Sequence, residues 1–209
     1  MPLATARPWL IAVLFGLMAL SPTRAGMTDA EVKAFTQDKA LAEKGDRVAQ
    51  YNMGINYASG LGVAKDQVQA VSWYRKAAEQ GDTSAQLNLG NCYANGDGVA
   101  KDQVQAVSWY RKAAEQGYAI AQNNLGVCYD KGEGVAKDEI EAYAYYNLAG
   151  ITDEVARENL AILEKKMSPD ARLLGQQRTK QLQKEIEGRL ETLDDLRKAV
   201  EKESLRKGA

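Results

Sequence analysis

The sequence contains no histidine, only two cysteines and only four prolines among its 209 residues. Without histidine, the chain cannot build a Ser-His-Asp triad, a Cys-His pair or a histidine-ligated metal site. Two cysteines are too few for a disulfide framework or a four-cysteine zinc site. The 27 basic and 28 acidic side chains leave a net charge of −1, which offers no basic face to nucleic acid. We therefore predict a binding protein that is not an enzyme and needs no cofactor.

Long apolar runs are also absent, except for one near the N-terminus. Trp9 to Leu20 form 12 apolar, uncharged positions, preceded by Arg7. A bilayer-spanning helix needs about 20 such residues, so this run has the length of the apolar part of a secretory signal peptide. Thr23 and Ala25 place small residues at the two positions that a signal peptidase reads. We predict that residues 1–25 are a signal peptide and that the protein is exported to the periplasm or the extracellular space. An uncleaved membrane anchor is the alternative.

The sequence does have an internal repeat with a period of 36 residues. Gly62–Gly81 recurs without change as Gly98–Gly117, and Gly134–Gly150 keeps the register with substitutions. The segments in front of these copies align at the same offset: they are Ala49–Tyr57, Ala85–Tyr93 and Ala121–Tyr129, followed by a degenerate half-copy, Ala156–Ala161. A fixed period of this length is the signature of a solenoid, in which each repeat is one supersecondary unit.

Each unit has the pattern of two antiparallel helices. In the second unit, the first helix carries one apolar stripe at helical spacing: Ala85, Leu89, Cys92 and Tyr93. Gly96 and Gly98 favour a helix end, and Asp102 with Gln105 has the spacing of a capping box. The second helix carries another stripe: Ala106, Tyr110 and Ala113. One such pair cannot offset its own ordering entropy, so the pairs must stack into an all-α solenoid of antiparallel helix pairs.

Three motifs recur in these units: Leu-Gly-x-x-Tyr, Gly-x-Gly-Val-x-x-Asp and Ala-x-x-Trp-Tyr-x-Lys-Ala-Ala-x-x-Gly. They closely resemble the SEL-one-like repeat family, a tetratricopeptide-related class, from Gly45 to about Gly150 and more weakly to Met167. The resemblance implies a right-handed superhelix that binds peptides or proteins, often as an adaptor in secretion, envelope or signalling assemblies. Some secreted relatives carry penicillin-binding or β-lactamase labels. Here Ser204 and Lys207 have a matching Ser-x-x-Lys spacing, but nothing else in the sequence supports that chemistry.

The repeats divide the chain into five predicted parts: the signal peptide (1–25), a capping helix (26–44), three repeats (45–150), a half-repeat (151–167) and a long amphipathic C-terminal helix (168–209). Thr28 and Glu31 have capping-box spacing and open the first of these helices. Ser168 followed by Pro169 is a favourable start for the last one.

The C-terminal helix carries apolar residues three or four positions apart: Leu182, Ile186, Leu190, Leu193, Leu196 and Val200. This pattern has two interpretations. Either the helix folds back on the last repeat, or it forms a homodimer with a second copy through a short coiled coil over residues 180–205. Only about three imperfect heptads are present, and Gly188 weakens them.

Asparagine recurs in register on the first helix of each unit: the row is Asn52, Asn88, Asn124 and Asn159. A side-chain amide offers both a donor and an acceptor, so a row of amides can bond an extended peptide backbone. In similar repeat proteins the residue before the Leu-Gly pair lies on the concave inner face and contacts ligand. We therefore predict an unidentified protein or peptide partner on this row, with Asn91 and Ser84 one turn away. The alternative is that the asparagines bond within the scaffold.

The two cysteines, Cys92 and Cys128, are also 36 residues apart. Axes of packed helices lie about 8–10 Å apart, whereas a disulfide needs Cα atoms within about 7 Å. We predict two buried free thiols.

Overall fold

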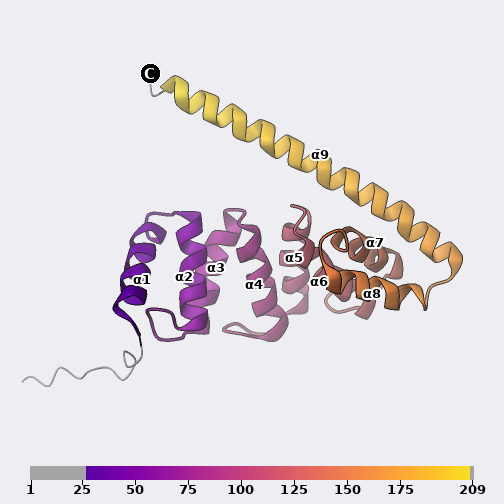
Figure 1. The fold of residues 1–209 in the computed structure, drawn as a ribbon, viewed down its shortest axis with the longest axis horizontal. Coiled ribbons are helices and arrows are strands. Elements are labelled where there is room, and N and C mark those ends of the chain that lie inside the picture. Colours follow the sequence, from indigo (N-terminus) through magenta and orange to yellow (C-terminus); the bar gives the residue numbers. More distant parts are fainter. Residues whose placement is uncertain (1–26, 208–209) are drawn as a thin grey trace, which may run out of the picture.

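The computed structural model describes residues 27–207, so the predicted signal peptide, residues 1–25, lies outside the described residues. Over the described range the chain forms nine helices and no strand: α1 (Asp29–Ala42), α2 (Arg47–Ser59), α3 (Gln67–Glu79), α4 (Thr83–Asn95), α5 (Gln103–Ala114), α6 (Ala119–Lys131), α7 (Glu139–Ala149), α8 (Glu154–Glu164) and α9 (Pro169–Lys207). Figure 1 shows α1 to α8 as a row of neighbouring helices, with α9 running back across the row. The predicted all-α solenoid of stacked helix pairs is confirmed. We call α2, α4, α6 and α8 the A helices, and α3, α5 and α7 the B helices.

Most helices begin at a residue whose side chain satisfies a free backbone N–H group of the first turn. Asp82 accepts a hydrogen bond from the backbone N–H of Ala85 at 2.9 Å at the start of α4. Asp102 accepts one from Gln105 N at 3.0 Å at the start of α5. Helix α6 is different, because Tyr118 stands at its N-cap position and makes no side-chain hydrogen bond there.

The loop between the two helices of a repeat depends on its glycines. Three of the A helices end at glycines in the left-handed region, with φ of 77°, 86° and 72°: Gly60, Gly96 and Gly132. Two residues further on, a methyl group built onto Gly98 would overlap the backbone carbonyl of Gln67, where the preceding B helix begins. Gly62 meets Glu31 of α1 in the same way. The Gly-x-Gly motif therefore turns the chain and lets each loop touch the unit before it, and α1 takes the place of a B helix in front of the first repeat.

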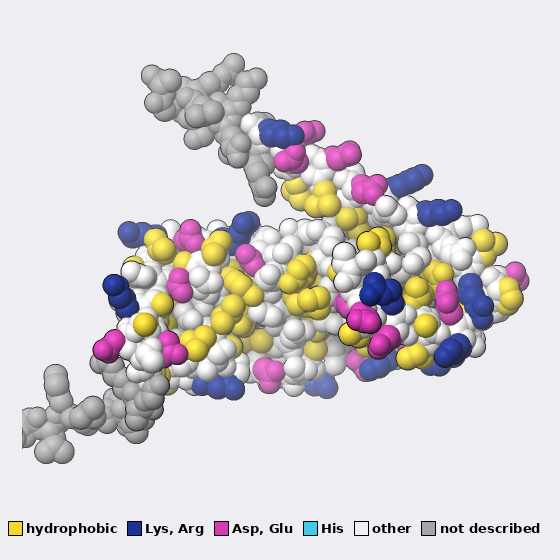
Figure 2. Space-filling view, in the orientation of Figure 1, with side chains coloured by type: hydrophobic (Ala, Val, Ile, Leu, Met, Phe, Trp, Pro, Cys, Tyr) yellow, Lys and Arg dark blue, Asp and Glu magenta, His cyan; other side chains and the backbone are white. Residues whose placement is uncertain are grey.

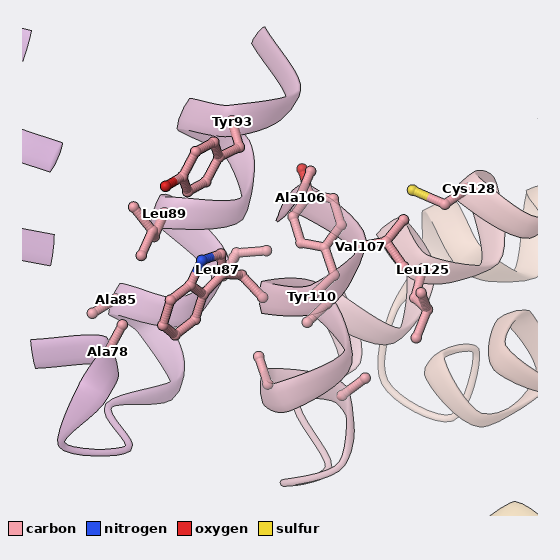
Figure 3. Packing of buried hydrophobic residues seen from close by; sticks show 14 of the residues in the cluster. Ala78, Ala85, Leu87, Leu89, Tyr93, Ala106, Val107, Tyr110, Leu125 and Cys128 are labelled. Carbon is pink, nitrogen blue, oxygen red and sulfur yellow. The ribbon is translucent and has the colours of Figure 1, made fainter. Parts of the chain in front are cut away.

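The core runs without interruption through the stacked units. Figure 3 shows Leu89, Val107, Tyr110 and Leu125, from α4, α5 and α6, packed between neighbouring helices. Alanines on the B helices are fully buried and let helices approach closely: Ala70, Ala77, Ala106, Ala113, Ala142 and Ala149. All seven side chains of the two stripes predicted for the second unit are buried. Each fully buried large side chain stabilises the fold by about 1.5–3 kcal/mol.

One contact joins the two helices of every repeat, and it explains the Leu-Gly pair. A methyl group built onto Gly90 of α4 would lie 2.6 Å from the ring atom Cδ1 of Tyr110 on α5. Gly126 and Tyr146 repeat this contact at 2.7 Å in the third unit. Because each tyrosine ring lies against the backbone of a glycine, a side chain at this position of the A helix would overlap the ring.

Both cysteines are buried free thiols, as predicted. Cys92 belongs to α4 and Cys128 to α6. They act as small apolar side chains in the core.

Helix α9 folds back on the last repeat over its first half. Gly175 lets the helix approach the ring of Tyr143 on α7, and the Nε atom of Arg178 donates to Glu141 Oε1 at 2.7 Å. Beyond these contacts Arg189 pairs with Glu115 beside α5, and the rest of the helix runs on over the N-terminal repeats (Figure 1). The fold-back interpretation therefore describes the first half of α9, while pairing with a second copy stays a prediction for the second half.

Replacing Gly90 with alanine should test the glycine–tyrosine contact. The added methyl group must displace the Tyr110 ring, so we expect the free energy of unfolding to fall by about 1–3 kcal/mol. Urea denaturation followed by circular dichroism measures the change. Gly188→Ala is the matched control, because a Cβ atom added at Gly188 on α9 would meet nothing within 4 Å. There the better helix former should leave stability unchanged or raise it by about 0.5–1 kcal/mol. Equal destabilisation by both variants would contradict this account.

Candidate functional site

The structure places the predicted asparagine row on one side of the solenoid. Asn52, Asn88, Asn124 and Asn159 are half-buried and lie at the same place on α2, α4, α6 and α8. Each has a neighbour one turn before it and another one turn after it on the same helix face. Together these twelve residues form what we call the A-helix face: Val48, Asn52, Ile55; Ser84, Asn88, Asn91; Ile120, Asn124, Val127; Val155, Asn159, Ile162.

Three members of the row donate hydrogen bonds within the scaffold. Asn52 Nδ2 donates to Asp38 Oδ1 of α1 at 3.2 Å. Asn124 Nδ2 donates to Asn91 Oδ1 of α4 at 3.4 Å, which joins two of the predicted site residues. Asn159 Nδ2 donates to Asn123 Oδ1 of α6 at 2.9 Å, and Asn123 is a residue that the sequence prediction missed. The amides therefore brace neighbouring helices, as the alternative interpretation expected.

Tyrosine hydroxyls from the B helices reach the same face. The ring of Tyr110 covers Gly90, and its hydroxyl donates to Asn91 Oδ1 at 2.8 Å. Burial raises the pKa of Tyr74 to about 12, helped by the nearby Cys92 thiol, while a hydrogen bond with Asn88 opposes the rise. Both hydroxyls thus meet an asparagine of α4, whose side-chain amide can satisfy them.

The bracing bonds leave capacity for a ligand. Each carboxamide has two N–H donors and a carbonyl oxygen. Among the described residues, no hydrogen bond reaches the Oδ1 atoms of Asn52, Asn124 and Asn159. Bracing and ligand binding are therefore compatible, and peptide binding by the row stays a prediction.

Exposed aliphatic side chains run beside the asparagines on the A-helix face. Val48, Ile120 and Val155 occupy the same place on α2, α6 and α8 and are 57%, 48% and 56% exposed. Ile162 at the other edge is exposed as well. Ser84 interrupts the aliphatic row on α4. Exposed apolar side chains gathered in register are a mark of interaction surfaces rather than of ordinary protein surface.

A second set of amides, also missed, belongs to the scaffold. Gln86 is buried, and its Nε2 atom donates to the carbonyl of Ala78 at 3.1 Å, at the end of the preceding B helix. Its Oε1 atom accepts from Gln116 Nε2 at 2.8 Å. Gln50 and Gln80 repeat this pairing at 2.7 Å in the first unit. The signal was present in the sequence as an Ala-Gln pair in every repeat.

Helix α9 lies over the B helices and not over the A-helix face. Within the described residues, its hydrogen bonds and ion pairs to the repeats reach Glu141 and Asn147 of α7 and Glu115 beside α5. A pocket of about 170 Å³ remains between α9 and the repeats, lined by Arg111, Tyr129, Tyr145, Arg178, Leu182 and Arg189, among others. Figure 2 shows hydrophobic side chains on the side of α9 that faces the repeats.

Other chemical features of the described chain are few. Among the side chains that the structure describes, no three Asp, Glu or Cys converge as a metal site would require. Ser204 and Lys207, the Ser-x-x-Lys pair, lie outside the residues whose side chains are described. None of the described helices combines the length and the apolar character of a membrane span.

Alkaline pH should destabilise the fold. Burial raises the pKa of both Cys92 and Cys128 to about 11, and burial raises the pKa of Tyr145 to about 12. In the unfolded chain thiols and phenols titrate near about 8.5 and 10, so the unfolded state loses its protons first as the pH rises. The stabilisation is complete below these values and is lost as the pH approaches about 11. We expect the urea midpoint to fall between about pH 8 and pH 11. A Cys92→Ala, Cys128→Ala double variant should show a smaller fall, and a pH-independent midpoint would contradict the burial of these groups.

Comparison with known proteins identifies the repeat. The family model described as Sel1 repeat matches residues 47–82, 83–118 and 119–150. No curated protein matches the sequence significantly.

Several solved structures resemble the fold. A Sel1 repeat protein from Oxalobacter formigenes is 38% identical with a TM-score of 0.56, over 62% of this chain and 56% of that one. Helicobacter pylori cysteine rich protein B is 24% identical with a TM-score of 0.51, over 64% and 97% of the two chains. A protective antigen present in uropathogenic Escherichia coli strains, with an SLR fold, is 33% identical with a TM-score of 0.48, over 78% and 44%. This chain thus spans a little over half the length of the Oxalobacter formigenes structure, at 56%.

Proposed function

Because the chain belongs to the Sel1 repeat family, whose members are typically protein-interaction scaffolds, we propose that it binds a protein segment on its A-helix face. The observation that carries this proposal is the row of exposed Val48, Ile120 and Val155 beside the asparagines. Covering apolar surface contributes about 25 cal/mol per Å², and the free carbonyl oxygens of the row can accept backbone N–H groups. The proposed partner is an extended segment that presents aliphatic side chains.

The spacing of the repeats fits such a segment. The A helices α2 and α4 contact each other directly, so equivalent residues lie about one packed-helix distance apart, roughly 10 Å. Three residues of extended chain span about 10 Å. Successive rows of the A-helix face therefore match every third residue of an extended partner.

A peptide library tests this proposal without knowledge of the natural partner. Random peptides displayed on phage are selected on the purified protein, and the affinities of selected peptides are measured by fluorescence anisotropy. The Val48→Ser, Ile120→Ser, Val155→Ser triple variant should bind them at least about tenfold more weakly, a loss of about 1.4 kcal/mol or more.

The matched control is a Val68→Ser, Val104→Ser double variant. These valines begin the B helices α3 and α5 and are 63% and 64% exposed, so they share the chemistry of the tested residues but not their location. The control should bind like the unchanged protein. Unchanged affinity in the triple variant, or equal loss in both variants, would contradict a site on the A-helix face.

We also propose that the protein is exported, with residues 1–25 removed as a signal peptide. The support is the short apolar run behind Arg7 and the small residues before Gly26. In this proposal the scaffold works outside the cytoplasm, where its partner must also be found.

A second candidate function is assembly through the distal half of α9. Leu190 and Leu193 are 41% and 48% exposed on the part of the helix that extends past its contacts with α7. If two copies pair through this part, light scattering should give twice the monomer mass, and Leu190→Ser with Leu193→Ser should restore the monomer. Leu173→Ser with Leu174→Ser is the control, since these leucines lie at the start of the same helix and are somewhat more exposed, at 54% and 53%. A monomer mass for the unchanged protein would remove this candidate.

A further inference from the structure

The three repeats are close copies. A residue that differs only in the third repeat can therefore mark a contact that the first two repeats make and the third does not. In the first two, an aspartate caps the A helix: Asp46 accepts from Ala49 N at 2.8 Å and Asp82 from Ala85 N at 2.9 Å. In the third repeat Tyr118 stands at that position and no side chain caps α6. The N–H groups of the first turn of α6 therefore have no partner within the helix, and the turn opens onto a pocket.

A second polar group at the same place also lacks its partner. Gln122 is 4% exposed, and its Nε2 atom donates to the carbonyl of Ala114 at 3.2 Å. The equivalent Gln86 also accepts a bond at Oε1 from Gln116, but the residue 36 positions after Gln116 is Thr152, which has no amide and is too short. In the described part of the chain no donor reaches Gln122 Oε1, and Gln122 lines the adjoining pocket.

The uncapped first turn of α6 and the Oε1 atom of Gln122 adjoin one shared cavity. One part, of about 230 Å³, is lined by α6, by the turn between α7 and α8 and by α9. Its apolar wall consists of Leu148, Ile151 and Ile186. The other part lies at the first turn of α6, and Gly117, Ala119 and Thr152 line both.

We propose that this cavity binds a neutral peptide segment that supplies the two missing groups. One backbone carbonyl accepts from the first turn of α6, as the Asp82 carboxylate does at α4. A backbone N–H donates to Gln122 Oε1, as Gln116 does to Gln86. One aliphatic side chain packs on Leu148, Ile151 and Ile186. The site adjoins the A-helix face at Ile120 but does not depend on ligand binding there.

The charges around the cavity select a neutral segment. Asp153, Glu154 and Glu187 lie at its walls and disfavour a carboxylate. The positive end of the α6 dipole disfavours a cation at the first turn. Asp153 is already engaged, since its Oδ1 accepts from Val155 N at 2.9 Å and caps α8. A peptide amide, which carries both a donor and an acceptor without net charge, fits these constraints.

Nuclear magnetic resonance titration with the blocked tripeptide acetyl-Ala-Leu-Ala-amide tests the proposal. We expect saturable shifts of the backbone amides of Ala119–Ala121 and of the Gln122 side-chain amide. The same peptide with glutamate in place of leucine should not bind. Absence of saturable shifts at these residues over the millimolar range would overturn the proposal.

In two variants the protein itself supplies a hydrogen-bonding group that the peptide is proposed to provide. Thr152→Gln introduces the amide that pairs with Gln122, and Tyr118→Asp introduces the cap of α6. Both restore residues that the first two repeats carry at the same positions, so both should fold. Each should weaken tripeptide binding by about tenfold, because the freed hydrogen bonds are then satisfied internally. Val104→Ser is the control and should leave binding unchanged, whereas full affinity in both restoring variants would overturn the proposal. Neither variant changes Val48 or Val155, so failure here is distinguishable from failure of the A-helix face.

Discussion

In each of the three repeats, a glycine of the A helix contacts a tyrosine ring of the B helix, and the rest of the structure depends on this contact. Because Gly90 has no side chain, Tyr110 lies directly on the backbone of α4 and draws the two helices together. The hydroxyl then arrives between successive A helices, where it must be satisfied, and Asn91 accepts its hydrogen bond. One packing contact thus sets the distance between the two helices of a repeat and places polar side chains between successive repeats.

These contacts explain structurally why asparagines recur in the row, and they also leave the row able to bind a ligand. The amides stand on the A-helix face because tyrosine hydroxyls and neighbouring helices need them there. Asn52 and Asn159 donate these bonds through Nδ2, and no described donor reaches their carbonyl oxygens, which belong to the helix face that also bears Val48 and Val155. A scaffold that braces itself with amides therefore offers polar groups in register without separate binding residues. Helix α9 covers the B helices on another side and leaves this arrangement open.

The few positions where the third repeat differs from the first two distinguish one junction from the rest of the array. The aspartate caps and the glutamine pairs satisfy every A helix of the first two units. Tyr118 and Thr152 break both systems at one junction, next to a cavity that α9 helps to enclose. The uncapped first turn of α6 and the Gln122 Oε1 atom, which no donor in the described part of the chain reaches, together define a chemically specific place in an otherwise regular array.

The sequence by itself determined the stacked helix pairs and the buried stripes, because a 36-residue period with caps and glycines at constant places favours one local fold. It also placed Asn52, Asn88, Asn124 and Asn159 in one row, since equivalent residues of stacked units must align. Tertiary structure alone decided which partners these amides take, such as Asp38 and Asn123, because those depend on distances between helices. It also decided that the first half of α9 packs on α7, since an amphipathic stripe specifies an apolar contact but not its partner.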